Sequence, residues 1–377
     1  MREYLLVFLV AAGMTYLLTV VAREIAVRTR ALAEVRDRDV HQEPIPYLGG
    51  LAMLGGLVAA YLVARELPFL SLITEVHETA GTVIVAGALI CGVGVLDDIF
   101  ELDALTKFGG QLVAAGYLVI NQVQYTVVPL PDNVQFSLDP RQGALLTVFI
   151  VVATVNAVNF VDGLDGLAAG VIGAGAVAFF VYCYQLSTFN QVTLATTGAL
   201  LSAALAGACA GFLPHNFHPA RLFMGDSGSM LLGLVLSASA ITLTNQFAAG
   251  DLAQGAGDRA ASLLPIYLLP ALIPLSILVV PLADLTLAVV RRTRAGRSPF
   301  APDKQHLHHR MLEIGHSHRR AVLILWAWAG LVGSGITLSS LYAGPKLWAG
   351  IGTAAVLTLL ATFVLPRLQK PAVLEGE

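Results

Sequence analysis

Residues 143–184 read GALLTVFIVVATVNAVNFVDGLDGLAAGVIGAGAVAFFVYCY. The two apolar runs of this stretch, 143–160 and 166–184, are each long enough to cross a bilayer as a helix. Between them lie Asp162 and Asp165, the only charged residues of the stretch. Ionisable side chains at membrane depth are costly and are retained mostly for function. The stretch therefore predicts two membrane helices joined by a polar turn that carries a functional site.

The composition places the whole chain in the membrane class. Of its 377 residues, 56% are hydrophobic and only 12% are charged, and the mean hydropathy is +0.74. In soluble domains about a quarter of the residues are charged. Cys91, Cys183 and Cys209 lie inside apolar runs without the spacing of metal ligands, so no zinc or redox role is expected. We expect a polytopic membrane protein without a nucleic-acid partner.

Eleven segments have the length and hydropathy of a membrane helix. They lie near residues 4–22, 47–64, 79–96, 107–121, 143–160, 166–184, 193–213, 227–246, 262–288, 321–341 and 346–366. The first lacks a strongly basic leader and a cleavage site, so it is expected to remain as a span. Prolines 265, 270, 274 and 281 predict that the ninth span is broken or kinked. The prediction is an all-α integral membrane protein with a single domain over residues 1–377.

The basic residues give an independent test of this layout, because Lys and Arg accumulate in cytoplasmic loops. With the N-terminus outside, seventeen of them fall in cytoplasmic segments and five on the other side. The predicted topology is therefore N-out and C-in. The cytoplasmic loops are expected near residues 23–46, 97–106, 160–166, 214–226 and 289–320. Four polar clusters then share the cytoplasmic side of the cell membrane.

The first cluster is Asp97-Asp98, at the end of the third span, followed by Lys107. Paired acidic residues at a helix end are often only a solvated terminus. They also provide the hard oxygen ligands that Mg²⁺ prefers, and a lysine complements phosphate as a point charge. Both interpretations stay open on this cluster alone.

The second cluster places Asn156, Asn159, Asp162 and Asp165 at steps of three, which puts neighbouring side chains on one face of a helix or helical turn. Glycine at position 163 allows a close approach of backbone to a ligand. A helix cap followed by a turn would use one Asp and one Gly. Two amides and two carboxylates exceed that need, so the cluster indicates function.

The third cluster, residues 225–229, precedes an apolar helix and includes Asp226. Asp and Ser are favoured helix N-caps, but an Asp beside a helix N-terminus also suits a divalent cation that bridges phosphates. Upstream, Asn216 and Phe223 offer an amide and a ring, which suit a flat heterocycle. An aromatic ring at this depth is also a common membrane-interface anchor.

The fourth cluster lies in the loop after the ninth span and contains His306, His308, His309 and Arg310. A zinc site usually shows a clearer ligand pattern. Histidine and arginine donors suit a diphosphate instead, because Arg grips two oxygens at once. The alternative is a basic interfacial loop held by anionic lipid headgroups, to which residues 316–320 would also belong.

Taken in this order, the four clusters resemble the motifs of the polyprenyl-phosphate N-acetylhexosamine-1-phosphate transferases, the glycosyltransferase 4 family. The resemblance covers about residues 36–320 and includes the eleven-span layout. It implies transfer of a sugar 1-phosphate from a UDP-N-acetylhexosamine to a polyprenyl phosphate, with release of UMP, as the first membrane step of cell-envelope glycan synthesis. It also implies Mg²⁺ as the cofactor, with Mn²⁺ as a substitute, and it is compatible with a homodimer.

The resemblance also implies roles for individual residues. Asp226 is expected to bind the metal, and Asp97 and Asp98 are expected to handle the metal and the lipid phosphate. The substrate-binding residues would be Lys107, Asn156, Asn159, Asp162, Gly163, Leu164, Asp165, Asn216, Phe223, His306, His308, His309 and Arg310. His41 is expected at the cytoplasmic face of the site, although turn formation by its neighbouring prolines explains that segment equally well.

Within the family, residues 38–50 and the His-Leu-His-His-Arg pattern look like the WecA and TagO type, which uses UDP-GlcNAc for lipopolysaccharide, teichoic acid or arabinogalactan synthesis. The MraY type, which uses UDP-MurNAc-pentapeptide, usually has three adjacent histidines in that loop. Arg310 departs from that pattern and argues against the muramyl substrate. UDP-GlcNAc is therefore the expected donor.

Two other classes of protein stay in view. An ion-coupled transporter would also carry Asp and Asn in broken helices, but near the bilayer midplane rather than at helix ends. An intramembrane aspartyl protease would need two aspartates and no His-Arg loop. For the transferase, a direct attack by the lipid phosphate competes with a two-step scheme through a phosphorylated aspartate.

Overall fold

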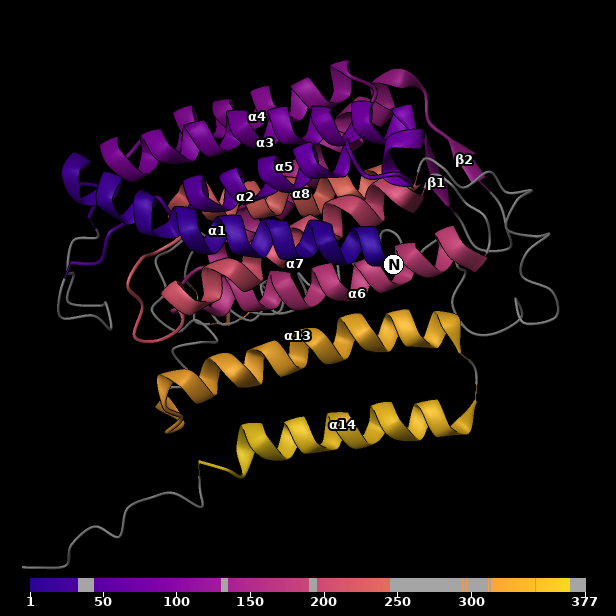
Figure 1. Cartoon of the computed structure of the whole chain (residues 1–377). Helices are drawn as coiled ribbons and strands as arrows, with labels where there is room; N and C mark the ends of the chain where they lie inside the picture. Colours follow the sequence, from indigo (N-terminus) through magenta and orange to yellow (C-terminus); the bar gives the residue numbers. More distant parts are fainter. Residues whose placement is uncertain are drawn as a thin grey trace, which may run out of the picture.

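The computed structural model describes residues 1–32, 44–129, 135–189, 195–244, 313–342 and 344–366, with a few isolated positions between 290 and 311. These residues form long helices that run side by side (Figure 1). The helices are α1 Arg2–Thr29, α2 Gly49–Ala64, α3 Thr74–Phe100, α4 Ala104–Ile120, α5 Pro140–Val161, α6 Leu167–Phe189, α7 Ala195–Asn216, α8 Gly225–Thr244, α13 His318–Leu341 and α14 Pro345–Phe363. A short 3-10 helix, Leu70–Leu72, precedes α3, and the strands β1 Val127–Pro129 and β2 Gln135–Ser137 form an antiparallel pair.

The all-α membrane fold is confirmed. Ten expected spans coincide with helices in the described ranges, and eight of these helices are long and apolar enough to cross a membrane. Helices α2 and α4 have 16 and 17 residues and fall just short of that length. The run near 262–288 lies outside the described residues, so the total of eleven spans and the kink remain predictions.

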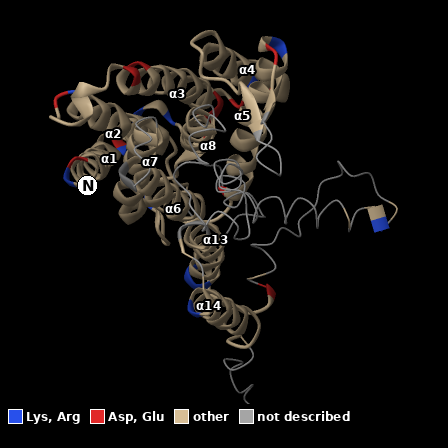
Figure 2. Ribbon diagram, turned by 90° about the vertical axis from the view of Figure 1, so that its right-hand side faces the viewer, with Lys and Arg blue, Asp and Glu red and all other residues tan. Residues whose placement is uncertain are grey.

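Helix α8 lies at the centre of the bundle. Residues 227–244 are all buried, and α2, α3, α5, α6 and α7 pack around them (Figure 2). Small residues permit this close packing, as is usual between membrane helices. A Cβ added at Gly94 of α3 would clash with the backbone of Ser227 at the start of α8. The first turn of α8 is therefore held directly against the last turns of α3.

The two ends of the bundle differ. Strands β1 and β2 lie at one end, and the α3–α4, α5–α6 and α7–α8 connections lie at the other (Figure 1). The start of α1 and the end of α14 lie at opposite ends, which agrees with termini on opposite sides of a membrane. Three of the predicted polar clusters therefore meet at one end of the helices. That this end faces the cytoplasm remains a prediction.

Candidate active site

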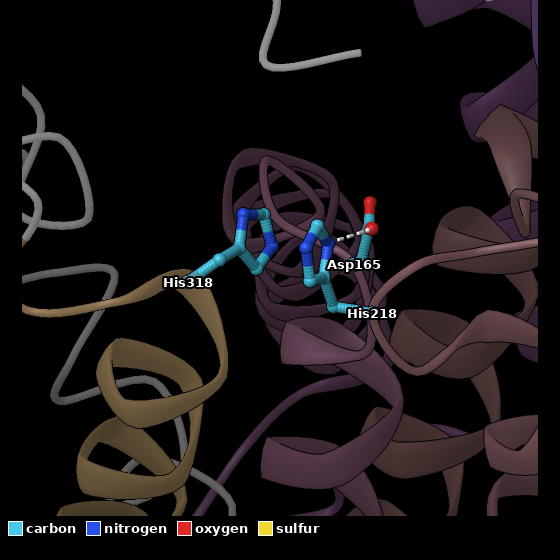
Figure 3. Close-up of side chains that lie close together, drawn as sticks. All are labelled: Asp165, His218 and His318. Carbon is cyan, nitrogen blue, oxygen red and sulfur yellow. Dashed lines mark hydrogen bonds and ion pairs between the residues drawn. The ribbon is translucent and has the colours of Figure 1, made fainter.

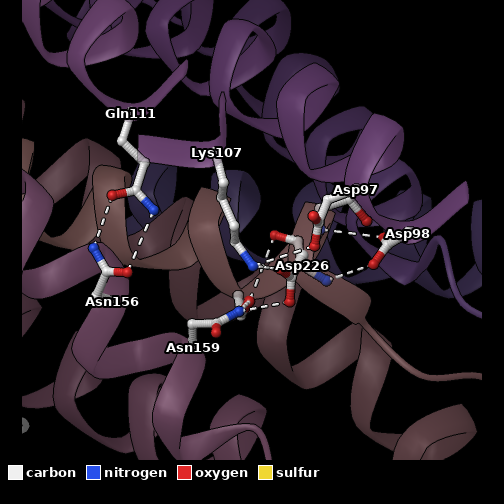
Figure 4. Close-up of polar contacts among 9 residues, drawn as sticks. Asp97, Asp98, Lys107, Gln111, Asn156, Asn159 and Asp226 are labelled. Carbon is white, nitrogen blue, oxygen red and sulfur yellow. Dashed lines mark hydrogen bonds and ion pairs between the residues drawn. The ribbon is translucent and has the colours of Figure 1, made fainter. Parts of the chain in front are cut away.

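A group of charged residues that we call the carboxylate–lysine cluster joins the end of α3 to the starts of α4 and α8. It consists of Asp97, Asp98, Lys107 and Asp226 (Figure 4). The Lys107 Nζ lies 3.2 Å from the Asp97 Oδ2 and also contacts the Asp226 carboxylate. All three of these side chains are partly buried, with exposed fractions of 16–23%. One ammonium thus links two carboxylates that are 129 positions apart in sequence.

The Asp98 carboxylate anchors the first turn of α8. Its Oδ1 accepts from the backbone N–H of Asp226 at 2.8 Å, and its Oδ2 accepts from that of Ser227 at 3.2 Å. These N–H groups have no partner within their own helix, so a carboxylate stabilises the helix end. Gly225 has φ 67°, and a Cβ there would clash with Asp98. Asp98 therefore fixes the position of Asp226.

Two amides of α5 support this cluster. The Asn159 Nδ2 donates to the Asp226 Oδ1 at 2.7 Å and to the Ser229 Oγ at 2.9 Å. One turn earlier, the Asn156 Nδ2 donates to the Gln111 Oε1 at 2.7 Å, and the Gln111 Nε2 donates back at 3.4 Å. Asn159 therefore orients a carboxylate of the cluster, whereas the Asn156 pair joins α5 to α4 beside Lys107.

The turn after α5 is tied to the α7–α8 connection. Asn216 is only 2% exposed, and its Oδ1 accepts from the Gly166 N–H while its Nδ2 donates to the Leu222 carbonyl, both at 3.0 Å. Gly166 has φ 77°, a conformation that favours glycine. Within the structure Asn216 thus bridges two backbone segments. Its predicted contact with a nucleotide is not tested by this geometry.

A second group, the histidine cluster, consists of Asp165, His218 and His318 (Figure 3). Asp165 is 3% exposed; its Oδ2 lies 2.7 Å from the His218 Nδ1 and accepts from the Ala220 N–H at 3.1 Å. The rings of His218 and His318 stack with centroids 4.2 Å apart and an angle of 14°. Nitrogen lone pairs lie in the ring planes, so parallel stacked rings do not converge on one cation. In this arrangement the histidine cluster is not a metal centre. It holds together the α5–α6 turn, the α7–α8 connection and the start of α13.

Asp162 follows the last residue of α5 and is partly buried. Burial, together with the nearby carboxylates of Asp98 and Asp165, raises the pKa of Asp162 to about 7. Gly163 is exposed, and Leu164 is buried in the core. The residues of the predicted nucleotide turn are thus close to the carboxylate–lysine cluster but differ in how far they reach solvent.

The segment before α8 is fixed by its contacts with the start of α2. The Phe223 N–H donates to the Pro46 carbonyl at 2.8 Å, and the Gly49 N–H donates to the Phe223 carbonyl at 3.0 Å. The Phe223 ring lies 5.9 Å from that of Tyr47. Phe223 is partly buried, so it is held at the same end of the bundle as Asp226.

The predicted residues His41, His306, His308, His309 and Arg310 lie outside the described residues. The alternative that residues 316–320 form a lipid-facing basic loop is wrong for the two histidines. His316 is buried with its Nε2 2.9 Å from the Thr362 carbonyl, and His318 is buried in the histidine cluster. Helix α13 packs its first turn against the protein here, so these rings are not available to headgroups.

Sequence reasoning missed two residues of this end of the bundle, Gln111 and His218, and it considered His318 only as part of a lipid-facing loop. Gln111 follows Lys107 by four positions, so helical spacing places it on the same face. His218 lies two positions after Asn216, so its closeness in sequence to a predicted site residue could have indicated it. The partnership of His218 with His318 spans one hundred positions and has no sequence signal.

The residues of the carboxylate–lysine cluster fit a magnesium ion. Mg²⁺ takes oxygen ligands, usually one or two carboxylates with water and phosphate oxygens. Asp97 and Asp226 already converge on one cationic group, the Lys107 ammonium, in a partly exposed position. The carboxylates of Asp97, Asp98 and Asp226 offer only oxygen atoms as ligands.

Comparisons with known proteins agree with this geometry. Residues 81–244 match the family described as Glycosyl transferase family 4. The chain is 46% identical over 376 residues to the decaprenyl-phosphate N-acetylglucosaminephosphotransferase of Mycobacterium tuberculosis, covering 98% of this chain and 90% of that protein.

Two further relatives are more distant. A probable undecaprenyl-phosphate N-acetylglucosaminyl 1-phosphate transferase of Bacillus subtilis is 33% identical, covering 86% of this chain and 82% of that protein. The phospho-N-acetylmuramoyl-pentapeptide-transferase of Desulforudis audaxviator is 32% identical, and the match covers 86% of this chain and 95% of that protein. The family expected from the four motifs is confirmed: the chain belongs to glycosyl transferase family 4 and is a multi-pass membrane glycosyl-1-phosphate transferase.

Proposed function

We propose that this enzyme transfers N-acetylglucosamine 1-phosphate from UDP-GlcNAc to decaprenyl phosphate or a related polyprenyl phosphate, giving the lipid-diphosphate sugar and UMP. The observation that carries the proposal is the position of the Lys107 ammonium between the carboxylates of Asp97 and Asp226. Phosphoryl transfer needs alignment and charge neutralisation more than covalent help. The names of the 45–46% identical relatives support GlcNAc and decaprenyl phosphate over the muramyl substrate.

Asp97 and Asp226 are the proposed magnesium ligands, with Asp98 as a third carboxylate beside them. When bound, Mg²⁺ would neutralise charge on the diphosphate of the donor. Asn159 holds one Asp226 oxygen through a 2.7 Å hydrogen bond, and Asp98 holds the backbone of the same residue. The protein therefore presents the Asp226 carboxylate in a fixed orientation.

Lys107 is the proposed contact for the phosphate of the acceptor lipid. An oxygen of that phosphate would form a new bond to the phosphorus that bears the sugar. The bond from this phosphorus to the bridging oxygen breaks, and UMP leaves with the electron pair. Asp97, 3.2 Å from the ammonium, would position the lipid phosphate and accept its proton where it carries one. The excess of Lys and Arg in the predicted cytoplasmic loops supports a site at that membrane face.

The test is a UMP-release assay with purified protein, Mg²⁺ and decaprenyl phosphate. UDP-GlcNAc, UDP-GalNAc and UDP-MurNAc-pentapeptide are compared as donors, and each component is omitted in turn. We expect turnover with UDP-GlcNAc and none without lipid or without Mg²⁺. Equal or greater turnover with UDP-MurNAc-pentapeptide contradicts the donor assignment. Labelled phosphate trapped on the protein before lipid is added contradicts the direct attack.

A further inference from the structure

Helix α1 changes character near its end. Its residues Leu17, Val20 and Val21 expose aliphatic side chains on the outer surface of the bundle, with Val20 60% exposed. The next turn brings Arg23 and Glu24, which are also exposed. Such a change from apolar to charged residues on one helix face marks the level of the lipid headgroups. The end of α1 is therefore where a lipid phosphate would meet the protein.

A cavity of about 520 Å³ opens at this level, between α1 and the α7–α8 connection. Its lining includes Val20, Val21, Arg23, Glu24, His215 and Arg221. The aliphatic side chains of Val20 and Val21 continue the exposed surface of α1, and Arg23, Glu24 and Arg221 add charged groups to the lining. A ligand with an apolar part and a charged head matches this division.

The charge of the cavity is positive. Within the part of the chain that the structure describes, neither the Arg23 nor the Arg221 guanidinium has a hydrogen-bond or ion-pair partner. The Glu24 carboxylate already accepts from the Arg28 Nε at 2.9 Å. Two guanidinium groups at one cavity are a strong donor set for a phosphate, because each offers two parallel N–H groups.

The cavity is built from fixed parts. The His215 ring lies against that of Tyr16 on α1, with centroids 4.7 Å apart. The Arg221 N–H donates to the His215 carbonyl at 2.8 Å, and the carbonyl of the neighbouring Leu222 accepts from Asn216. The backbone that carries Arg221 is therefore ordered by the same connection that leads into Asp226.

This cavity is separate from the carboxylate–lysine cluster. Helix α1 packs against α2 and α7, whereas α4, which carries Lys107, packs against α3 and α5 (Figure 2). An acceptor lipid whose phosphate reaches Lys107 would enter beside α4 rather than beside α1. A phosphate at Arg23 and Arg221 thus belongs to a second lipid molecule.

We propose that the cavity between α1 and the α7–α8 connection binds the headgroup of an anionic membrane phospholipid. Arg23 and Arg221 hold its phosphate, and Val20 and Val21 contact the adjoining glycerol and acyl carbons. Binding at Arg221 stabilises the connection that positions Asn216 and Asp226. The proposal concerns a lipid that is not consumed, so its binding is measured without turnover.

The experiment uses native mass spectrometry of the purified full chain, titrated with phosphatidylglycerol or with phosphatidylcholine of the same acyl chains. We expect retention of phosphatidylglycerol in preference to phosphatidylcholine. The double variant Arg23→Gln/Arg221→Gln should weaken phosphatidylglycerol binding on the order of tenfold, since each basic residue near the surface contributes to anionic lipid attraction. Val20→Trp, which fills the cavity without changing charge, should weaken it as well.

Arg65→Gln is the matched control, because Arg65 is an exposed arginine at the end of α2 that lies over the Tyr61 ring and does not line the cavity. Equal phosphatidylglycerol binding in the wild type and the double variant overturns the proposal. Equal retention of the two phospholipids does so too. Displacement of the bound phosphatidylglycerol by one equivalent of decaprenyl phosphate also overturns it, because the cavity would then belong to the acceptor.

Discussion

The carboxylate–lysine cluster and the histidine cluster both pair an aspartate with a nitrogen base at the same end of the bundle, yet they are built differently. In the first, Lys107 lies between two partly exposed carboxylates from different helices. In the second, Asp165 is buried, and its Oδ2 contacts both a ring nitrogen and a backbone N–H. The first can exchange its ammonium contacts for a cation or a phosphate, whereas the second holds three segments together.

This difference predicts which variants lose catalytic turnover and which lose stability. A buried carboxylate that loses its hydrogen-bond partner costs about 1–3 kcal/mol or more, so changes in the histidine cluster should reduce stability and substrate affinity. A partly exposed carboxylate tolerates loss of a partner better, because water replaces it. Changes at Asp97, Lys107 or Asp226 should therefore reduce turnover while leaving the fold intact.

The largest effect is expected for Asp226→Asn. It preserves the shape and the hydrogen bond from Asn159 but removes the charge that would hold the metal. Turnover should fall by about 100-fold to 1,000-fold, as when a charge-stabilising group is lost at an active site. The melting temperature should stay within a few degrees of the wild type.

Asp103→Asn is the control for this variant. Asp103 is also an acidic residue at this end, but it caps α4 by accepting from the Leu105 and Thr106 N–H groups, a task that Asn performs as well. UMP release by both variants is measured at saturating Mg²⁺. If Asp226→Asn retains more than a tenth of the wild-type turnover, the carboxylate–lysine cluster is not the catalytic centre.

A smaller effect on turnover, with an opposite effect on metal binding, is expected for Lys107→Met. The variant keeps the aliphatic stem and removes the ammonium that lies between Asp97 and Asp226. Turnover should fall on the order of 100-fold, because the acceptor phosphate loses its cation. Mn²⁺ should bind several-fold more tightly, because two carboxylates are released from a competing positive charge.

Electron paramagnetic resonance of free Mn²⁺ measures this affinity directly, and Lys107→Arg serves as the variant that keeps the charge. Unchanged Mn²⁺ affinity in Lys107→Met would show that the ammonium and the metal do not share a position. The proposed metal site would then need other ligands.

The third effect tests the histidine cluster. His218→Ala removes the ring that contacts the Asp165 carboxylate and stacks on His318. The KM for UDP-GlcNAc should rise about tenfold, with kcat changed less than about threefold, because a positioning interaction of about 1–2 kcal/mol is lost. His218→Asn retains a donor near Asp165 and should recover part of the affinity. An equal fall in kcat with unchanged KM would place His218 in the chemical step instead.

The helices themselves were largely predictable, because hydropathy is a property of local sequence. Their ends were less so. The third span was expected at 79–96, but α3 continues to Phe100 and so includes Asp97 and Asp98. A hydropathy window ends at charged residues, whereas the helix continues because its hydrogen bonds do not depend on polarity.

The site was predictable where residue type and spacing carry the information. Asp97, Lys107, Asn159 and Asp226 were all expected at one site, and they are in contact. The use of Asp98 as an anchor for α8 and the His218–His318 stack depend on how helices pack, so spacing gives no sign of them. The roles of these residues in catalysis remain predictions that the variants above test.

The smallest expected effect is a change in the pH dependence of stability at Asp162. This residue lies between the two clusters, so its ionisation reports on how deeply the turn that joins them is buried. Burial and the carboxylates of Asp98 and Asp165 raise its pKa from 3.8 to about 7. A raised pKa means that the folded protein favours the protonated form of Asp162. The contribution of this group to the free energy of unfolding is therefore fully present below the pKa of the unfolded chain, and it is lost as the pH rises through 7. Asp162→Asn has no carboxyl group at this position, so the variant does not lose this stability as the pH rises. The melting temperature of the variant relative to the wild type should therefore rise between pH 5 and pH 8, by roughly 2 °C.

Asp103→Asn gives the opposite case for the same measurement. Hydrogen bonds from the Thr106 hydroxyl and N–H lower the pKa of Asp103. The charged carboxylate therefore stabilises the fold at any pH above the pKa of the unfolded chain, and this contribution is lost only as the pH falls through the lower pKa of the folded protein. Between pH 5 and pH 8 the melting temperature of this variant should keep a constant offset from the wild type. If Asp162→Asn also keeps a constant offset, Asp162 is charged throughout this range. The two clusters would then be joined by a solvated turn rather than by a buried one.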